Sequence, residues 1–107
     1  MTEAPQTFDI VLKNGTVIDP KNSIDSLMDV GIRDGNIAAV SRDLDASNSA
    51  KVLDVTGLYV LPGLIDLHTH HFGYSGSVSP DEYAIPNGIT TVVDAGGSGW
   101  KNFEEFK

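Results

Sequence analysis

A short apolar run that follows a proline-glycine pair limits the folds open to this chain more than any other feature. Leu64–Leu67 comes directly after Pro62 and Gly63 and is apolar apart from Asp66, without a clean alternation of polar and apolar residues. Such a run is typical of a strand that is buried on both faces of a parallel sheet. Ile89–Val93 is a second run of this kind and is rich in β-branched residues. The sequence therefore predicts an α/β fold in this half of the chain.

Helix signals lie between and after these two runs. Residues 79–82, Ser-Pro-Asp-Glu, combine a capping serine, a proline suited to the first helical position and a glutamate that can complete a capping box. Pro86 limits the helix that starts there to little more than a turn or two. A glycine-rich loop, residues 95–99, follows the second strand, and residues 102–105 indicate the start of another helix. Strand, helix, strand, loop and helix are the beginning of a β/α series.

Residues 8–61 follow a different pattern, in which short strands flank two-residue turn signals. Asn14-Gly15 and Asp34-Gly35 suit the positive φ angles of a type I′ hairpin turn, and Thr56-Gly57 is flanked in the same way. The sequence therefore predicts a small antiparallel sheet system. Its strands are expected at residues 8–13, 16–18, 29–33, 36–40, 51–55 and 58–61, with a polar loop at 42–50.

Charge and composition exclude several classes of partner and site. Fifteen acidic and seven basic residues give a net charge of −8, which repels phosphate backbones and anionic lipid surfaces, so we expect neither nucleic acid nor membrane as a partner. The absence of cysteine excludes disulfides, thiolate metal sites and a cysteine nucleophile. The run LYVLPGLI is broken by Pro62, far short of the ~20 residues that span a bilayer. Without a leader-like amino terminus, the expected location is cytoplasmic.

All three histidines of the chain, at positions 68, 70 and 71, lie at the end of the first apolar strand. Because successive side chains of a strand point to opposite faces, Asp66, His68 and His70 are expected on one face. Two imidazoles about 7 Å apart along that face can converge on one divalent ion. A structural or surface pair is the alternative interpretation. The position at the carboxyl end of an apolar strand, where β/α barrels carry their chemistry, favours His68 and His70 as metal ligands.

Two further residues are candidates for contact with a substrate. His71 would project away from the pair, where it either touches substrate or is an ordinary loop residue. Asp94 ends the second strand. Its carboxylate could contact substrate, accept a hydrogen bond from a ligand histidine, or cap the glycine-rich loop that follows.

Taken together, these residues resemble a known family. The run Leu61–His70, LPGLIDLHTH, is similar to the Pro-Gly-hydrophobic-hydrophobic-Asp-x-His-x-His motif of the amidohydrolase superfamily. The segments FDIVLKNGTVIDP, DVGIRDGNIAAV and KVLDVTGLYVLPG resemble the strands of its small β-sandwich domain, and SPDEYAIPNGITTVVDAGGSGWKNFEEF resembles the amidohydrolase/deacetylase branch related to dihydroorotases. The resemblance implies that residues 1–62 are the N-terminal part of the β-sandwich. Residues 63–107 would then be the first strands and helix of a (β/α)8 barrel.

The resemblance also implies a metal-dependent hydrolase, in which His68 and His70 bind the more buried of one or two divalent ions, zinc being the first choice. In the family the other ligands come from later strands: a lysine, two histidines and an aspartate that also takes the proton of the attacking water. No catalytic residue is therefore expected before Lys107. Because such a barrel needs about 250 residues, we expect the chain to be part of a longer protein and to be inactive alone.

The residue at position 72, a phenylalanine, indicates which class of substrate to expect. Dihydroorotases that resemble this family carry an arginine two positions after the second histidine, and an aromatic ring cannot replace that bidentate cation. The resemblance therefore implies hydrolysis of an amide or ester bond in a small acylated molecule, by a protein expected to form a homo-oligomer. Three alternatives stay open: an aminopurine-type deaminase on the same scaffold, a non-catalytic β-rich binding or assembly module that holds a structural metal, and a degenerate remnant without a ligand.

Overall fold

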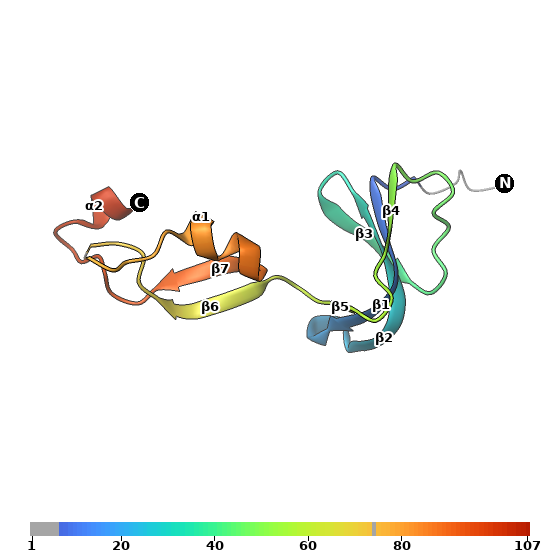
Figure 1. Cartoon of the computed structure of the whole chain (residues 1–107), viewed down its shortest axis with the longest axis horizontal. Helices are drawn as coiled ribbons and strands as arrows, with labels where there is room; N and C mark the ends of the chain where they lie inside the picture. The colour runs from blue at the N-terminus through green and yellow to red at the C-terminus, as the bar shows by residue number, and fades with distance from the viewer. Residues whose placement is uncertain (1–6, 74) are drawn as a thin grey trace. The chain divides into compact units, whose positions relative to one another are not determined.

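The computed structural model describes residues 7–73 and 75–107, and the chain divides into two compact units that meet between Pro62 and Gly63 (Figure 1). Residues 1–6 of the predicted first domain lie outside the described part. Among the helices of the described residues, none is long and apolar enough to cross a membrane.

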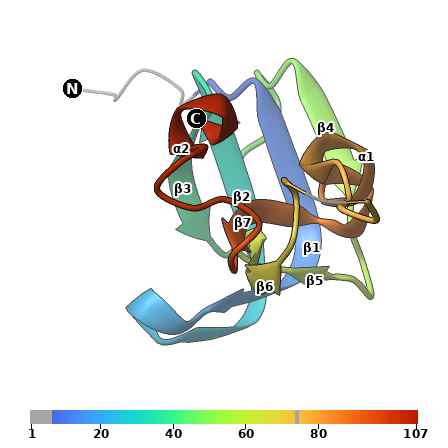
Figure 2. The same cartoon turned by 90° about the vertical axis from the view of Figure 1, so that its left-hand side faces the viewer.

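The first unit is a five-stranded sheet, in which β3, β2, β1 and β4 lie side by side (Figure 2) and β5 also pairs with β1. Its strands are β1 (Ile10–Asp19), β2 (Ile24–Arg33), β3 (Asn36–Ser41), β4 (Lys51–Asp54) and β5 (Tyr59–Val60), with a short 3-10 helix η1 (Pro20–Asn22) between the first two. β1 pairs with β2, and β2 with β3, in antiparallel fashion. The buried apolar core consists of Phe8, Val11, Val17 and Val30.

The two turn signals Asn14-Gly15 and Asp34-Gly35 correspond to different local structures. Asp34 and Gly35 have φ angles of 52° and 72° between β2 and β3, so the predicted hairpin there is confirmed. The hairpin predicted at Asn14-Gly15 is wrong, because β1 runs straight through these residues. Asn14 has a φ of 66°, and the register with β2 shifts next to it, as in a β-bulge. One type of β-bulge and the type I′ turn both use positive φ, so the Asn-Gly pair suits either.

The third predicted strand pair is also different in the structure. β4 and β5 do not pair with each other; each pairs with β1, and both are parallel to it. A turn that Leu58 closes by donating to Val55 (3.0 Å) lies between them, beside the bulge of β1. A Cβ atom at Gly15 would lie 2.7 Å from a methyl group of Val60. The missing side chain of Gly15 therefore lets this turn pack against the bulge, and the expected antiparallel system is wrong for residues 51–61.

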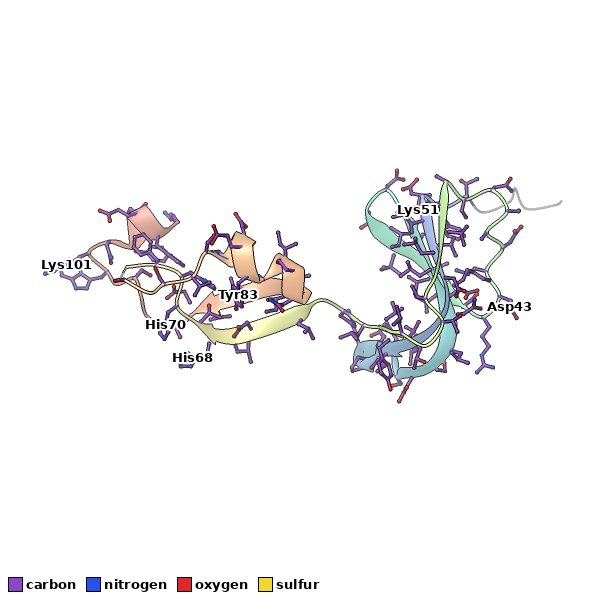
Figure 3. All side chains as sticks on the ribbon, viewed as in Figure 1. Asp43, Lys51, His68, His70, Tyr83 and Lys101 are labelled. Atoms are coloured by element: carbon purple, nitrogen blue, oxygen red, sulfur yellow. The ribbon has the colours of Figure 1, made fainter. Side chains whose placement is uncertain are left out.

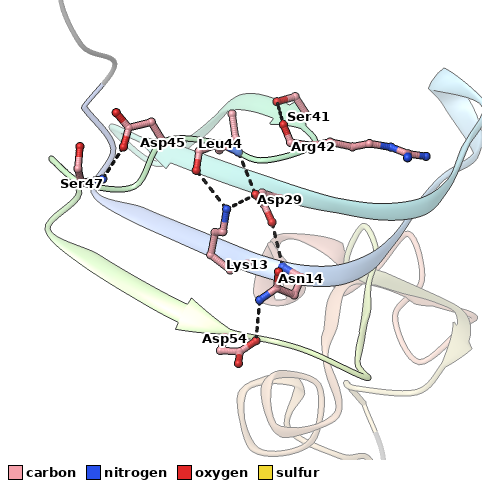
Figure 4. A network of polar contacts seen from close by, with 9 residues as sticks. All are labelled: Lys13, Asn14, Asp29, Ser41, Arg42, Leu44, Asp45, Ser47 and Asp54. Atoms are coloured by element: carbon pink, nitrogen blue, oxygen red, sulfur yellow. Dashed lines mark hydrogen bonds and ion pairs between the residues drawn. The ribbon is translucent and has the colours of Figure 1, made fainter.

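A buried carboxylate joins three parts of the first unit (Figure 4). Asp29 of β2 forms an ion pair with Lys13 of β1 and also accepts the backbone N–H groups of Asn14 and Leu44, each at 2.9 Å. Lys13 Nζ donates further to the carbonyl of Leu44 at 3.2 Å. Burial opposes ionisation of Asp29, but the hydrogen bonds from Lys13, Asn14 and Leu44 outweigh it and lower the pKa of this carboxyl. The network fixes the bulge and the polar loop at 42–50 against the sheet.

The second unit is built on two parallel strands, β6 (Leu64–Thr69) and β7 (Ile89–Asp94), which confirms the predicted pair. The connection between them contains the helix α1 (Pro80–Tyr83) and the 3-10 helix η2 (Ile85–Asn87), and α2 (Phe103–Phe106) follows β7. The helix starts at Pro80 as predicted, although the Ser79 side chain makes no capping hydrogen bond. The predicted order of strands and helices is therefore confirmed.

The apolar side chains of β6 are more exposed than the sequence predicts. Leu64, Ile65 and Leu67 expose 50%, 58% and 73% of their surface, whereas burial on both faces was expected. The reason is that the sheet of the second unit has only two strands within the described residues. Burial on both faces requires further strands and a second covering layer.

Candidate metal centre

His68 and His70 lie together at the carboxyl end of β6 (Figure 3). Their ring centroids are 5.3 Å apart and their ring planes are inclined by 78°. His68 is exposed and His70 is half-buried. Two imidazoles that bind one tetrahedral zinc ion at about 2.1 Å place their ring centres about 5 Å apart. The spacing of the pair therefore fits a shared divalent ion.

The pair supplies only part of a coordination shell. The described residues contain no group of three or more histidine, aspartate or glutamate side chains placed to hold a metal ion. A catalytic zinc site normally has three protein ligands and one open position. His68 and His70 thus fit the group as two of its ligands, and further ligands have to come from outside the described residues.

Asp66 does not follow the simple pattern expected for it. The register between β6 and β7 shifts between Asp66 and Thr69, so regular alternation does not extend from Asp66 to the histidines. Its carboxylate accepts hydrogen bonds from the hydroxyl of Tyr83 in α1 and from the backbone N–H of His68. These bonds, that of Tyr83 first, lower the pKa of Asp66. Tyr83 was not recognised from the sequence, because no local pattern connects residues 17 positions apart.

Asp94 caps the loop that follows β7. One carboxylate oxygen accepts the N–H groups of Gly96 (3.0 Å) and Gly97 (2.8 Å), and the other accepts the N–H of His71 (2.8 Å). The hydrogen bonds from Gly96, His71 and Gly97, in that order, lower the pKa of Asp94 to about 2. Of the three roles that the sequence left open, these bonds support capping of the glycine-rich loop.

Acidification is expected to release this loop. The folded-state pKa of Asp94 is lowered from 3.8 to about 2, so the stabilisation is complete above pH ~4 and is lost as the pH falls through about 2. NMR spectra recorded from about pH 6 to pH 1.5 should show the amide signals of His71 and Gly97 titrating together near pH 2. An Asp94→Asn variant should lack this transition. Separate midpoints for the two amides, or a shared one near pH 4, would contradict the expected linkage.

Backbone contact between the loops after β6 and β7 explains one of the glycines in the loop. A Cβ atom at Gly97 would lie 1.8 Å from the carbonyl oxygen of Phe72, so no side chain can be accommodated there. The ring of Phe72 packs against Phe106 of α2, with centroids 5.6 Å apart. The sequence showed a flexible loop at this place, but the need for glycine arises from the neighbouring loop.

His71 is held within the loop after β6. Its backbone donates to Asp94, its Nδ1 atom lies 2.5 Å from the carbonyl oxygen of Val78, and its ring lies beside Tyr83 at a centroid distance of 5.6 Å. A hollow at this end of β6 is lined by the three histidines, Val78 and Tyr83, among others. The four candidate residues named from the sequence are therefore neighbours in the second unit: His68 and His70 as a pair, His71 beside them, and Asp94 bonded to the backbone of His71.

Comparison with known proteins gives this geometry its context. No family model matches the chain. A dihydroorotase of Elusimicrobium minutum is 40% identical over 87 residues, which are 77% of this chain and 20% of that protein. A deacetylase of Agrobacterium fabrum is 42% identical over 76 residues, which are 69% of this chain and 19% of that protein. The chain thus spans about one fifth of the length of these relatives.

Solved structures agree with the sequence relatives. A D-aminoacylase, described with a binuclear metal centre, superposes with a TM-score of 0.64 at 43% identity, over 81% of this chain and 18% of that one. The same protein is described elsewhere as defining a subset of amidohydrolases. This chain is related to the amidohydrolases. An N-acyl-D-glutamate deacylase of Bordetella bronchiseptica, complexed with zinc, has a TM-score of 0.65 at 34% identity over 83% and 19% of the two chains.

The amidohydrolase relationship confirms the expected fold class. Strands of a small β-sandwich domain are followed by the start of a (β/α)8 barrel, and the parallel pair β6 and β7 with α1 between them is that start. The histidine pair lies at the carboxyl end of the first barrel strand, the end at which such barrels carry their active sites.

Proposed function

We propose that this chain supplies two metal ligands, His68 and His70, to an amidohydrolase that cleaves an amide or ester bond of a small acylated molecule. The spacing of the two rings, 5.3 Å at the end of β6, is the observation that carries the proposal. Zinc in the Bordetella deacylase and the binuclear centre of D-aminoacylase support a divalent metal, with zinc first, as one or two ions. Such an ion would supply Lewis acidity and activate a water molecule near neutral pH.

The residues of this chain would hold and shape the site without moving the proton of the water. Both carboxylates near the pair, Asp66 and Asp94, are already occupied by hydrogen bonds from Tyr83 and from backbone N–H groups. The family resemblance implies that the general base is an aspartate outside this chain, and these hydrogen bonds agree with that. His71 lines the same hollow as the pair and is proposed to contact substrate there, while Asp94 acts on substrate only through the loop it caps.

Phe72 favours a small acylated substrate over a substrate whose carboxylate has to be bound by a cation, as in dihydroorotases. Its ring packs against Phe106 at 5.6 Å, so the position next to His71 presents an apolar group and no cation for a carboxylate. The deacetylase and deacylase relatives fit this choice, whereas the dihydroorotase of Elusimicrobium minutum, at 40% identity, does not. We assign residues 1–62 to the β-sandwich domain and residues 63–107 to the barrel of the same protein.

Activity is expected only when the rest of the barrel is present. The protein encoded by the complete reading frame that contains this chain, loaded with zinc, should hydrolyse N-acetyl amino acids, whereas the 107-residue chain with zinc should not. Two histidines leave the ion without a full set of ligands and without a base. Release of free amine, followed with a colorimetric amine reagent, measures the activity of the complete protein and of the 107-residue chain. Enzyme-like turnover by the chain alone, or deamination of aminopurines by the complete protein in place of deacylation, would contradict this assignment.

A further inference from the structure

Tyr83 lies outside the histidine motif but is connected to it by two consecutive hydrogen bonds. We propose that Tyr83 is a positioning residue for the metal pair: its hydroxyl holds the carboxylate of Asp66, which in turn holds the backbone of His68. The inference rests on the proposed function, since it assumes that His68 and His70 bind metal.

The two hydrogen bonds meet at the two oxygens of one carboxylate. Tyr83 Oη donates to Oδ2 of Asp66, and the backbone N–H of His68 donates to Oδ1 at 3.2 Å. A carboxylate that receives one donor on each oxygen is fixed in orientation, and charge-assisted bonds of this type are stronger than neutral ones. The phenol of α1 is in this way connected to the peptide group of a ligand residue in β6.

The backbone of His68 lies where the pairing of β6 with β7 is irregular. Asp66 pairs with Val92 and Thr69 with Asp94, but in the described sheet neither Leu67 nor His68 is opposite a residue of β7. At such an irregularity the ladder is locally disrupted, so the orientation of a peptide group, and of the side chain it carries, depends more on other contacts. The bond to Asp66 is such a contact, and it lies at the residue that has to aim an imidazole at the ion.

Tyr83 is well placed to serve as the donor. Its hydroxyl donates to Oδ2 of Asp66, and this hydrogen bond raises the pKa of Tyr83 above its ordinary value of 10.0. Its ring lies beside that of His71, with ring centroids 5.6 Å apart. Packing of the ring and bonding of the hydroxyl are separable, because phenylalanine retains the first and removes the second.

The test is a Tyr83→Phe variant of the protein encoded by the complete reading frame. Metal affinity, measured by competition with a chromogenic chelator, is expected to fall about three- to tenfold, less than the 10–100-fold typical of groups that bond a ligand directly. The d–d absorption bands of the cobalt(II)-substituted protein should shift, because the imidazole of His68 changes its angle to the ion. Tyr59→Phe is the matched control, since Tyr59 lies in the other unit and is 70% exposed.

A second comparison separates positioning from general stability. Asp66→Asn should weaken metal binding, and adding Tyr83→Phe to it should cause no further loss, because both act through the same carboxylate. Spectra are recorded well below the unfolding temperature of each variant, so lower stability alone leaves them unchanged. Unchanged affinity and cobalt bands in Tyr83→Phe would overturn this inference while the proposed function stands. Wild-type protein that binds no metal through His68 and His70 would overturn both.

Discussion

Replacement of His68 or His70 by alanine is expected to lower the zinc affinity of the complete protein by about 100-fold and to abolish the hydrolase activity proposed for it. Structural zinc sites bind with about 10–16 kcal/mol, which is about 3 kcal/mol for each of four ligands, or roughly 100-fold per ligand lost. The two rings are 5.3 Å apart, a spacing that fits a shared ion, so under the proposed assignment each variant removes one ligand and leaves the other in place.

Isothermal titration with zinc, or chelator competition where binding is tight, measures this loss. His71→Ala is the matched control, because Nδ1 of His71 faces the carbonyl oxygen of Val78 and its backbone is held by Asp94. We expect less than a tenfold change in affinity for this variant. Equal losses in all three histidine variants would assign the metal to a different ligand set, and undiminished binding without His68 would remove it from this strand.

Asp29→Asn is expected to lower the free energy of unfolding of the first unit by about 2–4 kcal/mol, because it breaks a buried ion pair and leaves Lys13 with a weaker partner. The Asp29 side chain is only 5% exposed and that of Lys13 is 24% exposed, so water cannot easily replace the lost contact. The amide can no longer accept hydrogen bonds at both positions from Asn14, Leu44 and Lys13.

The ion pair of Asp29 and Lys13 also predicts how the stability of the first unit depends on pH. The pKa of Asp29 is lowered in the folded state, so its contribution is complete above the unfolded pKa of about 3.9 and is lost as the pH falls through the folded value. Native-state hydrogen exchange of β1 and β2 amides reads the first unit alone, at neutral pH and near pH 3. Asp25→Asn is the control, since Asp25 is exposed on the same strand. A difference below about 0.5 kcal/mol between the two variants would refute the stabilising role.

Local patterns predicted the elements of this chain better than their pairing. Asp34-Gly35 and Asn14-Gly15 carry the same signal for positive φ, yet one is a hairpin turn and the other a bulge. The difference is decided by residues 51–60, which add to β1 on its second edge and need it to remain continuous. No property of the two residues themselves contains that information, because it depends on contacts distant in sequence.

The candidate metal centre shows the same limit: local sequence patterns predict some of its residues but not their contacts with distant segments. The histidine pair was predictable because alternation along a strand is local, and the rings of His68 and His70 are indeed neighbours. The partners of Asp66 and Asp94 were not predictable, since Tyr83 and His71 reach them from other segments of the chain. Burial of the apolar strand β6 was overestimated for a related reason: its covering surfaces are not among the described residues.

The position of β1 has a consequence for how the first unit is made during synthesis. β1 emerges from the ribosome first, but the strands that complete its second edge, β4 and β5, end only at Val60. The hairpin of β2 and β3 can form early because its contacts are near in sequence, whereas closure of the sheet must bridge about 40 residues of chain. For that interval one edge of β1 stays unpaired, and an unpaired strand edge is a place where a strand of another nascent chain can add.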